Sequence, residues 1–184
     1  VIVPCREAGD ELARAAPSWR ALLDDATCLL TGAAGPRRAW PALDVPALRA
    51  RFGLPADRPV GVFIGNALPY RGLDLLLEAI DLLPADAPAG VVAVAGCPPD
   101  RLPLRARVRA LGPVWAVSDL LAAADFVINV NRFSLFDLST IEALEAGRPL
   151  LLAPVGGNLA VRALGAGTEM LPSLAPGAIA DGLA

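Results

Sequence analysis

Short apolar runs alternate with amphipathic stretches along most of the chain, and this pattern predicts an α/β fold. Near-continuous apolar runs separated by helices are typical of a parallel sheet that is covered on both faces. We therefore expect a Rossmann-like parallel sheet with helices on both faces. The expected strands are 60–64, 91–95, 107–111, 126–130, 150–153 and 169–171, and the expected helices are 73–83, 117–123, 139–146, 160–163 and 175–184.

The first part of the chain has a different pattern. Residues 1–3 and 26–30 predict short strands, and residues 7–23 predict a helix broken at Pro17. Residues 32–44 contain Gly, Pro and two arginines and indicate a linker, after which residues 45–52 predict a helix closed by Gly53. We interpret residues 1–44 as the end of an N-terminal domain with an interdomain linker. Residues 45–184 would form the Rossmann-like domain.

Composition excludes several kinds of chemistry. All sixteen basic residues are Arg, because the chain contains neither Lys nor His, so a histidine base, a lysine Schiff base and a His-ligated metal are excluded. The net charge of −3 gives no reason to expect nucleic acid. No apolar run reaches the roughly 18 residues of a membrane span. The chain begins without Met inside an apolar run, so we expect a piece of a longer protein, truncated at both ends.

The three cysteines indicate a reducing compartment. Cys5, Cys28 and Cys97 are odd in number, lie far apart and are not in CxxC spacing. This arrangement favours reduced thiols over a disulfide framework or a zinc site. We expect a cytoplasmic protein.

Two loops are expected at the carboxyl edge of the sheet, where ligands of open α/β sheets bind. The first, residues 65–72, places Arg71 just before a helix, which suits phosphate binding because a guanidinium can hold two oxygens. A solvated loop arginine is the alternative. The second, residues 131–138, precedes a helix whose N-terminal N–H groups favour an anion.

Two details of the second site are open at this point. Ser139 to Glu142 fits a capping box, in which Glu142 would return to the backbone of the helix cap. Alternatively, Glu142 would hold ligand hydroxyls. The Gly156-Gly157-Asn158 segment predicts a tight turn, with a role in binding as the alternative.

Several stretches, taken in order and spacing, resemble the C-terminal, donor-binding domain of GT-B glycosyltransferases of the GT4 type. The resemblance covers residues 48–184. Its segments are FIG at 63–65, YRGLDLLLEA at 70–79, RVRALGPV at 107–114, DLLAAAD at 119–125, FDLSTIEALEAGRP at 136–149 and VGGN at 155–158. It implies the C-terminal half of a GT-B fold. It also implies a retaining transferase of nucleotide-diphosphate sugars that needs no metal or other cofactor in this domain and has an upstream acceptor-binding domain.

The resemblance also implies roles for particular residues. Arg71 stands where the family has a basic residue on the donor diphosphate, and Glu142 stands at the second glutamate of the E-x7-E motif, which binds ribose. These two are the expected catalytic residues. The diphosphate and sugar would meet Gly65, Asn66, Arg71, Ser134, Phe136, Asp137, Leu138 and Ser139, and the base and ribose would meet Leu111, Gly112, Val114 and Glu142.

Three positions depart from the family pattern. Asn66 replaces a frequent basic residue, Ser134 replaces the first glutamate of E-x7-E, and Asp137 replaces the usual glycine. A carboxylate at Asp137 would oppose diphosphate binding if it pointed at the ligand, and would be harmless as a helix cap pointing away.

These departures define the alternatives. The favoured function is the donor-binding half of a transferase, inactive by itself. The second is a degenerate, non-catalytic domain that acts as a scaffold or assembly subunit. A third, an unrelated Rossmann-like nucleotide-binding module, is disfavoured because no G-x-G-x-x-G or Walker loop follows a strand.

Overall fold

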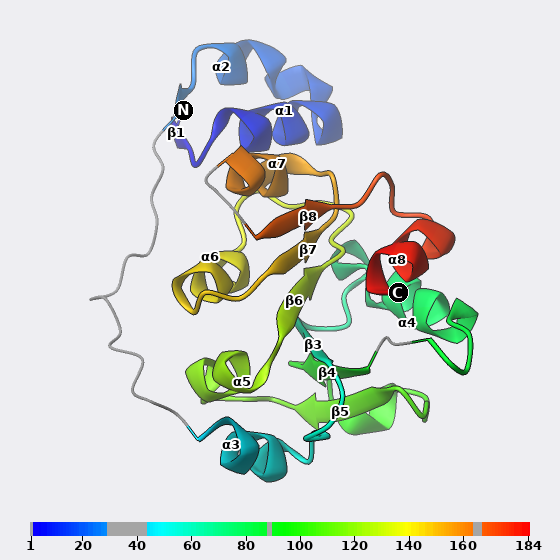
Figure 1. Cartoon of the computed structure of the whole chain (residues 1–184). Coiled ribbons are helices and arrows are strands. Elements are labelled where there is room, and N and C mark those ends of the chain that lie inside the picture. Colours follow the sequence, from blue (N-terminus) through cyan, green and yellow to red (C-terminus); the bar gives the residue numbers. More distant parts are fainter. Residues whose placement is uncertain (1, 29–43, 88–89, 164–166) are drawn as a thin grey trace.

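A computed structural model describes residues 2–28, 44–87, 90–163 and 167–184. Its centre is a six-stranded sheet in which every neighbouring pair is parallel, with strand order β5-β4-β3-β6-β7-β8 (Figure 1). The strands are β3 (Val60–Ile64), β4 (Val91–Ala95), β5 (Val108–Gly112), β6 (Phe126–Asn129), β7 (Leu150–Leu152) and β8 (Thr168–Met170). The expected Rossmann-like α/β fold is therefore confirmed.

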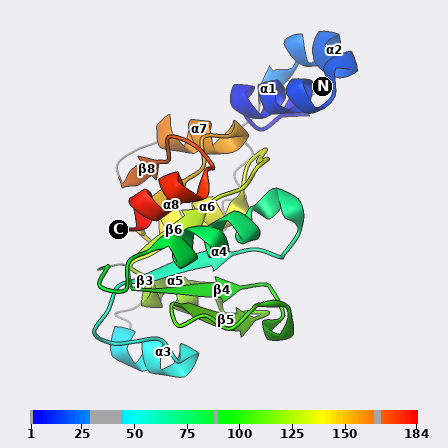
Figure 2. The same cartoon turned by 90° about the vertical axis from the view of Figure 1, so that its right-hand side faces the viewer.

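Helices cover both faces of the sheet, because successive side chains of each strand point to opposite faces. Figure 2 shows one face, where α4 (Leu73–Leu82) and α8 (Pro176–Leu183) lie side by side over the strands. The cluster beneath them includes Phe63, Val94 and Ile128. The opposite face carries α3 (Val45–Phe52), α5 (Val117–Ala123), α6 (Leu138–Glu145) and α7 (Gly156–Ala163), packed on Val60, Val62, Ala93, Ala95, Val127, Leu150 and Leu152.

One buried arginine joins α3 to this second layer. The Nε of Arg49 donates to the carbonyl oxygen of Ala123 at 3.0 Å, and its Nη2 lies 2.7 Å from a carboxylate oxygen of Asp125. The same Asp125 oxygen accepts the N–H of Val60 at 2.7 Å, just where β3 begins. Arg49 therefore connects α3, the end of α5 and the first strand of the sheet.

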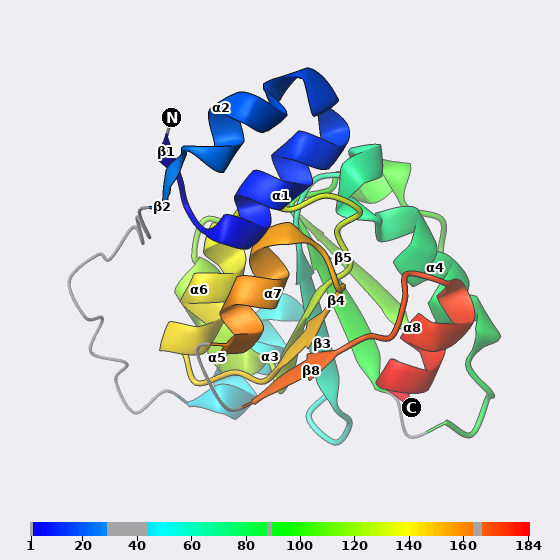
Figure 3. The same ribbon diagram turned by 90° about the horizontal axis from the view of Figure 1, so that it is seen from above.

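The N-terminal segment forms a small layer of its own against α7. It consists of β1 (Ile2–Val3), α1 (Arg6–Ala15), a short 3-10 turn η1 (Pro17–Trp19), α2 (Arg20–Asp24) and β2 (Thr27–Cys28), with β1 and β2 paired in parallel. Figure 3 shows α1 beside α7. The expected break at Pro17 is present. Most of the predicted linker, residues 32–44, lies outside the described residues, and the two-part domain division stays a prediction.

Most predicted strands and helices are found within one or two residues of their expected ends, but the predicted turn at Gly156-Gly157-Asn158 is wrong. These three residues form the first turn of α7. The described parts contain no helix long and apolar enough to cross a membrane. Cys5 is buried, and Cys97 is a buried free thiol.

The strand order places one crevice in the sheet. From β3 the chain continues outward through β4 to β5, whereas β6, β7 and β8 continue in the other direction. The order therefore reverses between the neighbours β3 and β6, and ligands of open α/β sheets bind at such a switch point, beyond the carboxyl ends of the strands. The loops that follow β3 and β6 are the two loops predicted to carry chemistry.

Candidate functional site: a cavity at the switch point between β3 and β6

The loop after β3 is a series of tight turns that ends in Arg71. The side-chain oxygen of Asn66 accepts the N–H of Leu68 at 3.2 Å, and η2 (Pro69–Arg71) then leads into α4. A Cβ placed on Gly65 would lie 3.5 Å from Cδ of Arg71, in ordinary van der Waals contact, so the end of β3 lies directly beside the arginine. The Arg71 guanidinium lies 5.2 Å from the centroid of the Tyr70 ring.

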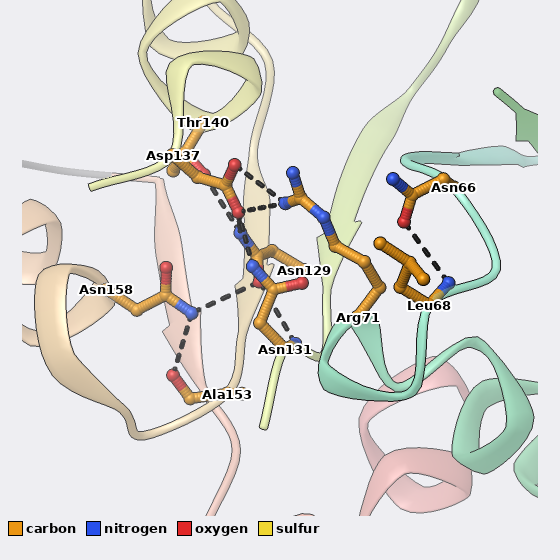
Figure 4. Close-up of polar contacts among 9 residues, drawn as sticks. All are labelled: Asn66, Leu68, Arg71, Asn129, Asn131, Asp137, Thr140, Ala153 and Asn158. Carbon is orange, nitrogen blue, oxygen red and sulfur yellow. Dashed lines mark hydrogen bonds and ion pairs between the residues drawn. The ribbon is translucent and has the colours of Figure 1, made fainter. Parts of the chain in front are cut away.

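The loop after β6 is held by a network of buried amides, drawn in Figure 4. The side-chain nitrogen of Asn129 donates to Asp137 and to the hydroxyl of Thr140, both at 3.1 Å. The side-chain oxygen of Asn129 accepts the backbone N–H of Asn131 at 3.2 Å and the side-chain nitrogen of Asn158 at 3.3 Å. One amide thus connects the end of β6 to the starts of α6 and α7.

Arg71 and Asp137 meet across the crevice. The Nη1 of Arg71 lies 2.8 Å from one carboxylate oxygen of Asp137 and 2.7 Å from the other, and the side-chain nitrogen of Asn131 also donates to Asp137. The ion pair is largely shielded, since the two side chains are 22% and 13% exposed. Burial, the largest influence, lowers the pKa of Arg71, but the hydrogen bond and charge of Asp137, with Tyr70, outweigh it and raise the pKa. The arginine is therefore a permanent cation with a built-in counter-ion.

This geometry decides two points about the start of α6 that the sequence left open. The cap residue of the helix is Asp137, but its side chain makes no capping hydrogen bond and instead points at Arg71. The capping box from Ser139 to Glu142 is not formed, because the cap residue is Asp137 and the helix already begins at Leu138.

The Gly156-Gly157 segment packs directly against the backbone of the loop after β6. A Cβ on Gly156 would clash with the carbonyl oxygen of Ser134, and one on Gly157 would clash with that of Leu135. The N–H of Gly157 donates to the Ser134 carbonyl at 2.9 Å. The two glycines therefore let α7 begin in direct backbone contact with the loop after β6.

Between these loops lies a cavity of about 430 Å³. It is lined by Tyr70, Arg71, Asn131, Phe133, Ser134, Leu135, Phe136 and Asp137. Two buried polar atoms of this lining, Nε of Arg71 and Oγ of Ser134, have no hydrogen-bond partner among the described residues. Because unpaired buried polar atoms are costly, a ligand that hydrogen-bonds to them would be favoured.

The structure brings four predicted diphosphate residues together and leaves others apart. Arg71, Ser134, Phe136 and Asp137 line the cavity. Leu138 and Ser139 form the adjoining first turn of α6, and Asn66 is exposed on the facing loop. Glu142 lies one helical turn beyond Leu138, on the same side of α6, and is half-buried.

Three of the residues predicted for the base and ribose, Leu111, Gly112 and Val114, lie by the edge strand β5, whereas Glu142 lies on α6. Leu111 and Val114 line a second cavity, of about 440 Å³, together with Arg109 and the exposed Trp115. The buried Gly112 accepts the N–H of Gly96 at 2.8 Å through its carbonyl oxygen. The structure thus divides the predicted donor residues between two hollows.

Sequence reasoning missed the amides that organise the site. Asn129 and Asn131 belong to the FVINVN segment, whose pattern predicts a buried strand followed by a polar loop residue. The available signal was the type of residue, because an asparagine at the end of an apolar parallel strand leaves a buried polar group that needs partners. Tyr70 and Phe133 are further lining residues that were not predicted.

A second ion pair fastens the two loops together outside the cavity. The Arg132 guanidinium bonds both carboxylate oxygens of Asp74, at 2.7 and 2.6 Å, and the carbonyl oxygen of Pro69, at 2.5 Å. The backbone N–H of Arg132 also donates to the carbonyl oxygen of Tyr70 at 2.7 Å. Arg132 therefore ties the loop after β6 to the turn that carries Arg71.

The Arg132 guanidinium, chiefly through its hydrogen bond, holds the pKa of Asp74 below its usual value. A lowered folded-state pKa means that Asp74 stabilises the fold above the unfolded pKa of about 3.9 and loses this effect as the pH falls through the folded pKa. The contribution should stay below about 1 kcal/mol, because the Asp74 side chain is 57% exposed. We expect Arg132→Gln to raise the pKa of Asp74, followed by NMR titration of its carboxyl group, toward that of an unpaired aspartate. An unchanged midpoint would show that the ion pair is not formed in solution.

The fold agrees with comparisons to known proteins. The model of the family "Glycosyl transferases group 1" matches residues 58–184. This chain therefore belongs to the glycosyl transferases group 1 family, and its fold is that of the C-terminal domain of a GT-B glycosyltransferase.

Particular relatives are similar to parts of the chain. The D-inositol 3-phosphate glycosyltransferase of Mycobacterium tuberculosis is 34% identical over 130 residues, which cover 62% of this chain and 26% of the relative. The chain thus spans about a quarter of the length of the curated relatives it matches.

Solved structures share the fold at low sequence identity. The crystal structure of Anabaena HepE in complex with UDP-glucose is 20% identical, with a TM-score of 0.74, and covers 100% of this chain and 52% of the HepE chain. The crystal structure of WaaG, a glycosyltransferase involved in lipopolysaccharide biosynthesis, is 20% identical, with a TM-score of 0.70. The match covers 85% of this chain and 45% of the WaaG chain.

Proposed function

We propose that the cavity beside Arg71 binds the diphosphate of a nucleotide-diphosphate sugar, and that this chain is the donor-binding half of a retaining glycosyltransferase. One observation carries the proposal. At the switch point of the sheet, Arg71 from the loop after β3 faces the N-terminus of α6 across the cavity. A guanidinium opposite the positive end of a helix is an arrangement that favours a phosphate anion.

The Arg71 guanidinium keeps part of its hydrogen-bonding capacity for a ligand. Asp137 occupies Nη1, which leaves the Nε–Nη2 edge outside the ion pair, and Nε is buried without a partner. This edge can hold two oxygens of one phosphate group. In the transferase, Arg71 and the first N–H groups of α6 would stabilise the negative charge that develops on the leaving diphosphate.

The remaining roles complete the proposal by resemblance to the family. Glu142 would hold the ribose hydroxyls, and Leu111, Gly112 and Val114 would flank the base. Gly65, Asn66, Ser134, Phe136, Leu138 and Ser139 would complete the diphosphate and sugar site. No group of three or more potential metal ligands occurs among the described side chains. We infer a cytoplasmic enzyme whose acceptor-binding domain precedes residue 1, with no metal held by this domain.

A second candidate function, a non-catalytic scaffold or assembly subunit, is favoured by one specific observation. The cation that would bind the diphosphate is already neutralised by Asp137. A domain that had lost donor binding would tolerate such a pair. The two candidates differ in whether the cavity binds nucleotides at all.

Calorimetric titration with UDP, GDP, ADP and TDP would separate the two candidates. We expect one nucleotide to bind the chain with micromolar affinity. Arg71→Ala and Glu142→Ala should each weaken that binding at least about tenfold, or about 1.4 kcal/mol, because each removes a direct ligand contact. Arg105→Ala is the matched control, since Arg105 pairs with Asp81 at 2.7 and 2.8 Å near the far end of α4. Folded protein that binds none of the four nucleotides would contradict donor binding and favour the scaffold.

A further inference from the structure

The cavity at the switch point has an unusual charge balance for a site that accepts a diphosphate. Of its eight lining residues, Arg71 is the one cation and Asp137 the one anion. The nearby Arg132 is neutralised by Asp74. The cavity is therefore lined by side chains that can donate hydrogen bonds, namely Arg71, Asn131 and Ser134, without a net positive charge.

The Asp137 carboxylate is fixed in this position by more than the arginine. It accepts hydrogen bonds from Asn129 at 3.1 Å and from Asn131, and its side chain is 13% exposed. Three donors from β6, the loop after it and the loop after β3 hold one carboxylate in place. An anion that binds to the free edge of Arg71 must therefore share the guanidinium with Asp137, close to a charge that solvent screens only weakly.

We propose that Asp137 is a specificity-determining residue that makes the cavity discriminate between ligands by the charge of their terminal phosphate. The inference rests on the proposed function. The terminal phosphate of a nucleoside diphosphate has two ionisable oxygens, as a phosphate monoester does, and a monoester carries about −1.5 to −2 charges at pH 7. The same phosphate esterified to a sugar has a single ionisable oxygen and carries one charge fewer at full ionisation. Because repulsion grows with the charge of the ligand, Asp137 disfavours a nucleoside diphosphate more than the corresponding nucleotide sugar.

This discrimination has a consequence for turnover. The donor of the proposed transferase enters as the sugar ester, and the leaving group is the free nucleoside diphosphate. The bond between the anomeric carbon of the sugar and the phosphate oxygen breaks, and that oxygen keeps the electron pair and the new charge. The anomeric carbon forms its new bond to the nucleophile of the acceptor, which gives up its proton. Asp137 would then weaken the binding of the product relative to the donor. The geometry assigns Asp137 a role in product release.

The test compares paired ligands on wild type and on Asp137→Asn, which removes the charge but keeps the size of the side chain. Calorimetry would use UDP with UDP-glucose, GDP with GDP-mannose, and ADP with ADP-glucose. We expect Asp137→Asn to raise the affinity for the nucleoside diphosphate about tenfold and for the sugar ester about threefold, so that their ratio shifts about threefold. Asp81→Asn is the charge-matched control, because it breaks a comparable Arg–Asp pair near the far end of α4 and should leave both affinities unchanged. Asp137→Ser, which should shift the ratio in the same direction, replaces Asp137→Asn if that variant does not fold.

Each outcome decides a separate question. Equal gains for both ligands, or a loss of binding to both, would overturn the charge discrimination and leave the proposed function intact. A loss of binding to both ligands would identify Asp137 as a residue that positions Arg71. Failure of every ligand to bind the wild type and both variants would overturn the proposed function, and the inference with it.

Discussion

A Gly156→Ala variant is expected to lose about 3 kcal/mol of the free energy of unfolding and to lose the donor site with it. The backbone of Gly156 has a φ of +35°, a region that costs an L-residue roughly 1 kcal/mol or more. The added Cβ would also clash with the carbonyl oxygen of Ser134. Overpacking of this kind costs about 1–3 kcal/mol, and the atom in the way is backbone of the loop that lines the cavity.

Two other glycines separate these effects. Gly147 has a φ of +65° with nothing within 4 Å of an added Cβ, so Gly147→Ala should show the conformational cost alone, about 1 kcal/mol. Gly177 lies in α8, also with nothing within 4 Å, so Gly177→Ala should be neutral or slightly stabilising. Urea denaturation of the three variants measures the differences. If Gly156→Ala lowered the free energy of unfolding no more than Gly147→Ala, the close contact between α7 and the Ser134 loop would be contradicted.

Asn129→Ala is expected to destabilise the fold by a similar amount, about 3 kcal/mol. The substitution removes an amide that makes four hydrogen bonds in a buried setting, to Asp137, Thr140, Asn131 and Asn158. Each buried group left without a partner costs about 1–3 kcal/mol. We expect the loss of stability to lie near the low end of the summed costs of these unpaired groups, because Asp137 keeps its hydrogen bonds to Arg71 and Asn131.

Thermal denaturation would measure this effect as a decrease of about 10 °C in Tm, since each kcal/mol shifts the Tm of a domain of this size by about 2–4 °C. Asn66→Ala is the matched control, because Asn66 is exposed and its side chain bonds only to the N–H of Leu68 among the contacts described. That variant should lose no more than about 0.5 kcal/mol. A loss of this small size for Asn129→Ala would show that the network does not organise the site.

The sequence was sufficient to predict the fold because its strongest signals are local. Apolar runs such as 60–64 and 91–95 can be buried on both faces only in a parallel sheet, and the helix pattern around residues 117–123 is equally direct. The order of the strands is not a local property. It depends on pairings between strands far apart in the sequence, such as that of β3 with β6, so the reversal between these two strands became visible only in three dimensions.

The Gly156-Gly157 segment shows why one local prediction was wrong. Consecutive glycines favour a turn, and propensity alone gives no reason to begin a helix there. The structure requires small residues at this point because the backbone of the Ser134 loop passes directly against α7. Tertiary packing overrode the local preference.

The relative position of the two loops was predicted, but not the electrostatics between them. The alternation of strands and helices placed Arg71 and the start of α6 at the same edge of the sheet, and in the structure Arg71 and the cap residue Asp137 line one cavity. The pairing of Arg71 with Asp137 joins residues 66 positions apart in the sequence. A charge at position 137 is compatible with a helix cap or with an ion pair, and only the direction of the side chain distinguishes the two.

A crystal structure of the chain soaked or co-crystallised with UDP would test the central claim most directly. We predict that the diphosphate lies in the cavity between Arg71 and the first turn of α6, with phosphate oxygens on the Nε–Nη2 edge of the guanidinium and on the N–H groups near Leu138 and Ser139. If the nucleotide is instead bound entirely in the hollow beside Trp115 and β5, with no phosphate near Arg71, the cavity at the switch point is not the diphosphate site.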